Sequence, residues 1–261
     1  MTGTQVISHS AAQELDVLAT RYKRAGGLGL QVLNLVGTQA ENLLERLPDS
    51  VKTRLEIATE RALNIALDAA GHSRARVGDA PDWLNRAATG AMGAAGGLGG
   101  LPSALAELPV TTTVLLRAIQ GIAAEHGFDP DDPEIRADCI QVFAAAGPLE
   151  QDDGANMAFL SARLSLTGAT VHGIIARVAP RLATVLGQKL AAQAVPVIGA
   201  VAGAATNFAY ASYYQEMAHV HFGLKRLAER EALPRDVLVA DLARRLKPPG
   251  GPAGARIDAR R

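Results

Sequence analysis

Apolar and polar residues follow a helical period along most of the chain, most clearly in residues 51–70, VKTRLEIATERALNIALDAA. A polar position recurs there every four residues, and a face of small and aliphatic residues lies beside it. Asp49 and Ser50 supply N-cap chemistry at the start, and Gly71 predicts the end of this helix. The polar stripe consists of Lys52, Glu56, Glu60, Asn64 and Asp68, and the apolar face of Val51, Leu55, Ala58, Ala62 and Ala66.

The same period predicts helices over most of the remaining chain, while no stretch alternates strictly and no Asn-Gly hairpin signal occurs. We expect an all-α, single-domain bundle of about eight to ten helices with two glycine-rich apolar helices at its centre. Residues 1–50 would hold N-terminal helices, 51–233 the helical core, and 234–261 a last helix with a flexible basic tail. The individual helices are expected near 9–25, 28–47, 51–70, 80–96, 101–126, 133–146, 155–178, 180–194, 196–229 and 234–247.

Glycines gather in residues 90–100, and the stretch GAAGGLGGLP (93–102) raises the question of a phosphate-binding loop. Such a loop needs Lys-Ser or Lys-Thr after its last glycine, or a strand before it and a helix after it. Neither pattern is present, so we interpret the glycines as a packing feature that lets two helices approach closely, or as a break between two helices. The four-residue spacings that place glycines on one helix ridge are Gly93/Gly97 and Gly96/Gly100.

A second uncharged stretch, residues 194–211 (AVPVIGAVAGAATNFAYA), places Gly199 and Gly203 four residues apart. Its eighteen residues reach the length at which a membrane span becomes a candidate. Pro196 and Asn207 count against a span, and small side chains gain little free energy on transfer to lipid.

The other apolar run, residues 101–118, carries Glu107 near its middle. An acidic charge at mid-bilayer costs about 3 kcal/mol on insertion scales, although a partner could neutralise it. We therefore predict that neither run spans a membrane. Both are expected to be buried helices of a soluble or membrane-associated bundle, and residues 93–118 and 194–211 are expected to pair as its apolar centre.

Composition limits the class of protein. The 261 residues contain 26 Lys and Arg and 26 Asp and Glu, so no overall positive charge favours nucleic acid as a partner. Hydrophobic residues make up 48% and aromatic ones 4%, which predicts a core of Ala, Leu, Val and Ile. Cys139 is the only cysteine, so no disulfide can form within the chain. The first residues, MTGTQ, lack the regions of a signal peptide, and we expect a cytoplasmic location.

Acidic and proline residues follow one another in residues 128–134, FDPDDPE. The cluster could serve a metal or acid–base site, but its order also matches a helix start. Asp132 would then be the N-cap, Pro133 the first helical residue, and Glu134 would face the positive end of the helix dipole. We favour the helix start.

Two separated motifs mark residues 96–147 and 195–210. The first combines a Gly-Gly-Leu-Pro turn, an acidic residue before a proline, a helix that leads to His-Gly, and a Pro-Glu helix start. The second, VPVIGAVAGAATNFAY, follows a Pro-x-x-Gly-x-x-x-Gly pattern that ends in Asn plus an aromatic residue. Over residues 50–230 the chain thus resembles the EcsC protein family. The candidate motif residues are Gly97, Gly99, Gly100, Pro102, Glu107, Pro109, Arg117, Gln120, Gly127, Pro133, Pro196, Gly199, Gly203 and Asn207.

The resemblance implies work at or near the inner membrane, since the family takes its name from a protein encoded beside the ATPase and membrane subunits of a bacterial ABC transporter. The partner would be the lipid surface of that membrane or a membrane protein. No catalytic residue, metal ligand or cofactor follows from the resemblance. Two positions depart mildly from the family pattern, because Glu107 stands where aspartate is more common and His126 where tyrosine is.

Residues capable of catalysis are present without the patterns that activate them. Glu216 and His219 are three apart on a predicted helix, as in carboxylate-bridged metal bundles, but no second Glu-x-x-His occurs. Cys139 lies on a predicted amphipathic helix, where a small buried hydrophobe is the simpler interpretation. Ser103, Ser161 and Ser165 lack a Gly-x-Ser-x-Gly context. We therefore favour a protein without catalytic activity.

Two functional classes stay open on the sequence. The favoured one is a non-enzymatic, membrane-associated helical protein, accessory to an ABC transporter or an envelope process, with its last helix and tail against the inner membrane. The other is a soluble hydrolase or metal-dependent enzyme with a site near Glu107, Arg117, Gln120 and Asn207. The basic residues of the last helix and tail are Arg244, Arg245, Lys247, Arg256, Arg260 and Arg261.

Overall fold

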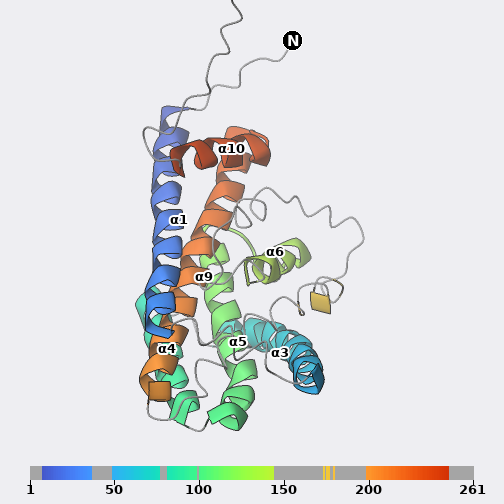
Figure 1. Cartoon of the computed structure of the whole chain (residues 1–261). Helices are drawn as coiled ribbons and strands as arrows, with labels where there is room; N and C mark the ends of the chain where they lie inside the picture. The colour runs from blue at the N-terminus through green and yellow to red at the C-terminus, as the bar shows by residue number, and fades with distance from the viewer. Residues whose placement is uncertain are drawn as a thin grey trace, which may run out of the picture.

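The computed structural model describes residues 8–36, 49–76, 81–98, 100–143 and 198–246, together with the isolated positions 173, 175, 176 and 179 (Figure 1). The described residues form seven α-helices and no strand, which confirms the all-α prediction but not the count of eight to ten helices. The helices predicted near 155–178 and 180–194 lie outside the described residues, except for the isolated positions. The seven helices are α1 (His9–Val36), α3 (Asp49–Arg76), α4 (Asp82–Leu98), α5 (Gly100–Glu125), α6 (Pro133–Phe143), α9 (Ile198–Glu231) and α10 (Arg235–Leu246).

Helix α9 is the central helix of the bundle. Every residue from Ala209 to Leu224 is buried, as expected for a helix that is covered on all sides. Helices α1, α4, α5, α6 and α10 all contact it, and α3 packs on α5 (Figure 1). Helix α1 runs antiparallel to α9, because Glu14 pairs with Arg230 whereas Arg21 pairs with Glu216.

The two glycine-rich segments meet where α4 crosses α9. Gly93 of α4 faces Gly203 and Asn207 of α9, and Gly90 faces Ala204 and Phe208. Since Gln215 on the same helix donates a hydrogen bond to the carbonyl of Asp82, the two helices are antiparallel. The contact predicted between residues 93–118 and 194–211 is therefore present at Gly93, which faces Gly203 and Asn207.

Two predicted helix ends are wrong. Helix α1 continues through Gly26 and Gly27 to Val36 instead of breaking there, and α3 continues through Gly71 to Arg76. A glycine inside a helix costs only about 1 kcal/mol relative to alanine, which the buried face of a long helix can offset. At Gly26 and Gly27 no atom beyond the helix lies within 4 Å of the position that a Cβ would take.

The predicted start of α6 is confirmed. The helix begins at Pro133, and the side chain of Asp132 accepts a hydrogen bond of 2.7 Å from the N–H of Glu134. Asp129 caps the preceding turn in the same way, with a bond of 3.0 Å from the N–H of Asp131. These aspartates therefore cap backbone turns, which is the simpler of the two interpretations of this run.

Helix α5 ends in a Schellman motif that places His126 beside a glycine. The N–H of Phe128 donates to the carbonyl of Ala123 at 3.0 Å, and the N–H of Gly127 donates to that of Ala124 at 2.8 Å. Gly127 has a φ of +83°, a conformation that glycine adopts without strain. The motif fixes the direction in which the chain leaves the helix.

The apolar runs considered as membrane spans belong to helices of this bundle. Residues 101–118 lie in α5 and 198–211 in α9, while 194–197 are outside the described residues. In the part of the chain that the structure describes, no helix combines the length and the hydropathy that crossing a bilayer requires. Cys139 is buried in the hydrophobic core, as predicted.

Candidate functional site

A cavity of about 500 Å³ lies between α1, the end of α5 and α9. Its volume is within the range typical of sites for small molecules. Helix α9 contributes a row of residues spaced by four, three and four, which places them on one helix face. The lining residues from the three elements are Glu14, Val17, Leu18 and Arg21; Glu125, His126 and Gly127; and His219, Gly223, Arg226 and Arg230.

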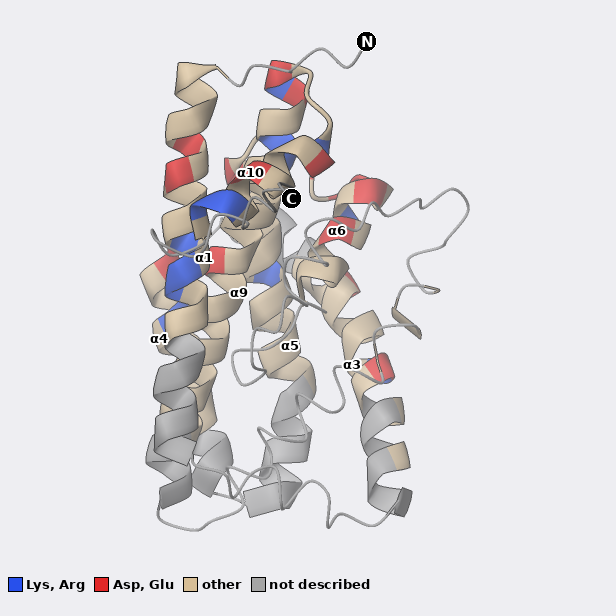
Figure 2. Ribbon diagram, turned by 45° about the horizontal axis from the view of Figure 1, so that its top comes forward, with Lys and Arg blue, Asp and Glu red and all other residues tan. Residues whose placement is uncertain are grey.

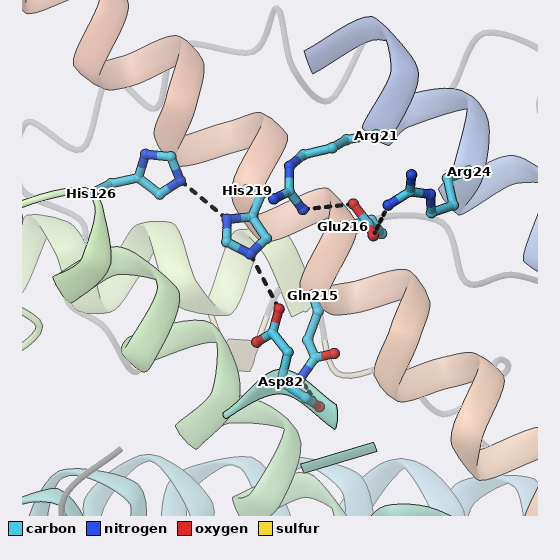
Figure 3. A network of polar contacts seen from close by, with 7 residues as sticks. All are labelled: Arg21, Arg24, Asp82, His126, Gln215, Glu216 and His219. Atoms are coloured by element: carbon cyan, nitrogen blue, oxygen red, sulfur yellow. Dashed lines mark hydrogen bonds and ion pairs between the residues drawn. The ribbon is translucent and has the colours of Figure 1, made fainter. Parts of the chain in front are cut away.

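A chain of three polar side chains reaches the cavity from the start of α4 (Figure 3). His219 Nε2 lies 3.4 Å from Asp82 Oδ2, and His219 Nδ1 lies 3.2 Å from His126 Nε2. Since a carboxylate only accepts hydrogen bonds, His219 carries its proton on Nε2 and accepts on Nδ1. His126 then donates through Nε2, which leaves its Nδ1 as an acceptor.

The protonation of this chain follows from burial and neighbouring charge. Burial, followed by the neighbouring charges of His219, Arg21 and Arg226, lowers the pKa of His126 to about 4. The hydrogen bond from His219 lowers the pKa of Asp82, although its burial acts in the opposite direction. Around pH 7, Asp82 is therefore ionised and His126 is neutral.

Glu216 lies next to this chain on α9 and points toward α1 (Figure 3). Its side chain is only 5% exposed and accepts from Arg21 at 2.9 Å and from Arg24 at 3.3 Å. Glu216 and His219, which share the spacing of a metal-binding pair, are thus turned to different partners. Among the described residues, no three His, Cys, Asp or Glu side chains are placed to hold a metal ion.

A second buried cluster joins α6, α9 and α10. Asp138 Oδ1 lies 3.3 Å from His221 Nε2, and Asp138 Oδ2 accepts from Lys225 at 2.8 Å. Arg235 donates to His221 Nδ1 at 3.0 Å, so His221 carries its proton on the nitrogen that faces Asp138. Burial, followed by the charge of Arg235, lowers the pKa of His221. These contacts tie three helices together and lie apart from the cavity lining.

Lys, Arg, Asp and Glu residues lie on α1, α6, α9 and α10 (Figure 2). Arg245 bridges α10 to α1, at 2.8 Å from Asp241 and 2.5 Å from Asp16. Arg244 lies 2.5 Å from Asp241. The two arginines that the sequence offered for membrane contact are therefore engaged in ion pairs within the protein.

The predicted motif residues are spread over several elements. Gln120 and Asn207 are buried, Arg117 and Pro109 are half-buried, and none of these four lines the cavity. Gly127 lines the cavity, Pro133 begins α6, and Gly203 faces Gly93. The backbone of Gly97, Gly100, Pro102, Glu107 and Gly199 is helical but their surroundings are not described, and Gly99 and Pro196 lie outside the described residues.

The sequence did not predict that Asp82 pairs with His219, or that Arg21 and Arg226 line the cavity. The row His219, Gly223, Arg226, Arg230 is legible in the sequence as a polar and small stripe with helical spacing. Asp82 gave no comparable signal, because it meets His219 across 137 positions of the chain.

Comparisons with known proteins identify the family. Residues 72–227, more than half of the 261-residue chain, match the model of the EcsC protein family. No curated protein and no solved structure matches the chain. The matched residues include the whole of α4, α5 and α6 and the part of α9 that carries His219, Gly223 and Arg226. The chain therefore belongs to the EcsC protein family.

Proposed function

We propose that this chain is a non-enzymatic helical protein that associates with the cytoplasmic surface of the inner membrane, as an accessory to an ABC transporter or an envelope process. The observation that carries the proposal is the outer face of α4. A helix face turned to water normally carries charged side chains. All exposed residues within 81–94 are instead apolar, namely Pro81, Trp83, Leu84, Ala87, Ala88 and Ala91.

Aromatic side chains lie along this face. Trp83 is 65% exposed and Leu84 is 43% exposed at the start of α4. Phe208 of α9 is 46% exposed and lies beside Gly90 of α4. Gly90 is seven residues from Trp83, so the two residues lie on the same side of α4. Tryptophan is enriched where an apolar phase meets water. A small-residue face with aromatic side chains along it suits contact with a lipid surface without a membrane span.

The proposed membrane contact lies on α4, whereas the sequence favoured the last helix, which is α10, together with the tail. Arg244 and Arg245 are paired with Asp241, so they have little free charge to offer a lipid surface. The basic residues of the tail lie outside the described residues and stay candidates for a supporting role, at about 1 kcal/mol each near an anionic leaflet.

The single tryptophan makes a direct test possible. Because Trp83 is the only tryptophan and is exposed, its fluorescence reports the environment of the α4 face alone. We expect vesicles that contain anionic lipid to shift the emission of Trp83 to shorter wavelength and to carry the full-length protein upward in a flotation gradient. Unshifted emission and protein that stays at the bottom of the gradient would refute the proposal.

A matched pair of variants separates this face from general hydrophobicity. Ala88→Glu introduces a charge in the middle of the exposed α4 face, and Ile57→Glu introduces one at an exposed apolar position of α3. We expect Ala88→Glu to abolish flotation and Ile57→Glu to preserve it. Equal loss in both variants would mean that α4 is not the contact.

A hydrolase is the second candidate, and the chain Asp82–His219–His126 at a cavity favours it. A neutral imidazole oriented by a His–Asp pair can accept a proton from water. Turnover of a chromogenic phosphate or carboxylate ester that disappears in His126→Gln would support this candidate. The absence of turnover, or turnover retained in the variant, would count against it.

A further inference from the structure

The cavity between α1, α5 and α9 is lined by groups that donate hydrogen bonds. Arg21, Arg226 and Arg230 reach it, and the carboxylates among its described lining residues are Glu14 and Glu125. Three guanidinium groups against two carboxylates give the lining a net positive charge and repel metal cations. Guanidinium groups hold carboxylate and phosphate oxygens through paired N–H donors.

The arginines differ in how far they are already engaged. Arg230 lies 2.7 Å from Glu14, and Arg21 lies 2.9 Å from Glu216. Arg226 forms no ion pair with any described residue. Its donors are therefore available to a ligand without the loss of an ion pair to any residue that the structure describes.

Two glycines keep the space beside these groups open. The guanidinium carbon of Arg226 lies 3.9 Å from the position that a Cβ on Gly127 would take. A Cβ on Gly223 would lie 2.7 Å from Leu18 Cδ2 and 3.6 Å from His126 Cε1. A side chain at position 223 would thus occupy the floor of the cavity between α1 and His126.

We propose that this cavity binds a phosphate-type oxyanion, carried by a small soluble molecule or by a lipid headgroup, with Arg226 as its main charge partner and His126 beside it. The volume of about 500 Å³ leaves room for an organic group in addition to the anion. Val17 and Leu18 supply an apolar wall for that group. This site is separate from the exposed face of α4 and goes beyond the proposed membrane association.

Binding is coupled to a proton at His126. The titratable groups that face His126 are His219 and Arg226 from α9 and Arg21 and Glu14 from α1. Together with burial, which is the largest cause, all of them except Glu14 lower the pKa of His126, to about 4. An anion beside Arg226 offsets this repulsion and raises the pKa of His126 toward its ordinary value. The bound complex therefore takes up a proton, and affinity increases as the pH falls from about 7 to about 5.

The first experiment measures binding of glycerol 3-phosphate by isothermal titration calorimetry at fixed ionic strength. Removing one charge-assisted partner in Arg226→Gln is expected to weaken binding about tenfold. Arg61→Gln is the matched control, because Arg61 is exposed on α3 and forms no ion pair with a described residue. Equal affinity in the wild type and Arg226→Gln, or equal weakening in both variants, would overturn the site.

A parallel arm separates the two sources of phosphate. Binding of glycerol 3-phosphate that depends on Arg226 supports a soluble ligand, whereas Arg226-dependent binding only to vesicles with phosphatidic acid supports a headgroup. If neither probe shows binding that depends on Arg226, the site is refuted. Vesicle binding that responds to Ala88→Glu but not to Arg226→Gln would leave the membrane proposal standing and refute this one.

Inorganic sulfate tests the proton coupling, because its charge stays constant between pH 5 and 7 whereas phosphate itself titrates there. We expect sulfate to bind more tightly to the wild type at pH 5 than at pH 7, and equally at both values to His126→Gln. The same pH dependence in the wild type and the variant would show that His126 does not take up the proton.

Discussion

Gly93 on α4 lies so close to Gly203 on α9 that a Cβ at position 93 would be 2.2 Å from the carbonyl oxygen of Gly203. It would also lie 2.5 Å from the side-chain nitrogen of Asn207. The obstacle at Gly203 is backbone, which cannot rotate away as a side chain does. The close approach of α4 to α9 therefore requires a glycine, which has no Cβ, at position 93.

Gly93→Ala is expected to destabilise the protein by about 3 kcal/mol, at the upper end of the range for overpacked cores. The control is Gly26→Ala in α1, where no atom beyond the helix lies within 4 Å of the new methyl group. There alanine is expected to stabilise the helix by about 0.5–1 kcal/mol. Urea unfolding measures both free energies. A cost below 1 kcal/mol for Gly93→Ala would show that the two helices adjust easily.

The two arginines that share Glu216 are expected to contribute unequally. Arg21 lies at 2.9 Å and is 32% exposed, whereas Arg24 lies at 3.3 Å and is 61% exposed. Since exposed ion pairs contribute little, Arg24→Met should cost less than about 0.5 kcal/mol, and Arg21→Met about 1–2 kcal/mol, because Glu216 stays buried. Urea unfolding at low and moderate salt measures both. An equal cost would mean that solvent screens Arg21 as fully as Arg24.

Local features of this fold were predictable because they depend on neighbouring residues. The cap at Asp132 and the first helical position of Pro133 follow from side chains within one turn. The break expected near Gly26 was wrong for a related reason, since the helical propensity of one residue does not include the buried face that continues through α1.

The candidate site depends instead on distances in sequence that no local pattern encodes. His126 and His219 meet across 93 positions, and Arg21 and Glu216 across 195. Their meeting results from the packing of α1 and the end of α5 on α9, which Gly223 permits because it lies beside Leu18 of α1 and His126. The sequence predicted packing roles for Gly93 and Gly203, but neither the role of Gly223 nor the contact between His126 and His219.

Two helix ends share one geometry but differ in the residue that closes it. The N–H of Leu233 donates to the carbonyl of Ala228 at 3.0 Å, so α9 ends as α5 does, but with Ala232 at a φ of 51° in place of Gly127. A non-glycine residue in this conformation costs about 1 kcal/mol. Ala232→Gly is therefore expected to raise the melting temperature and Gly127→Ala to lower it. Melting temperatures that both rise, or both fall, in the two variants would contradict this explanation.

Asp138 is expected to make stability depend on acidic pH. Burial raises its pKa, but the hydrogen bonds from His221 and Lys225 outweigh that effect and lower the pKa from 3.8 to about 2. A carboxyl group whose pKa is lower in the folded state stabilises that state above pH 4, and the contribution is lost as the pH falls from about 4 to about 2. The difference amounts to about 2 kcal/mol. Asp138→Asn lacks this contribution at every pH, so the gap in unfolding free energy between the wild type and the variant should narrow over this interval. Urea unfolding at several pH values measures the gap, and a gap that stays constant between pH 5 and 2.5 would show that Asp138 is not the titrating group.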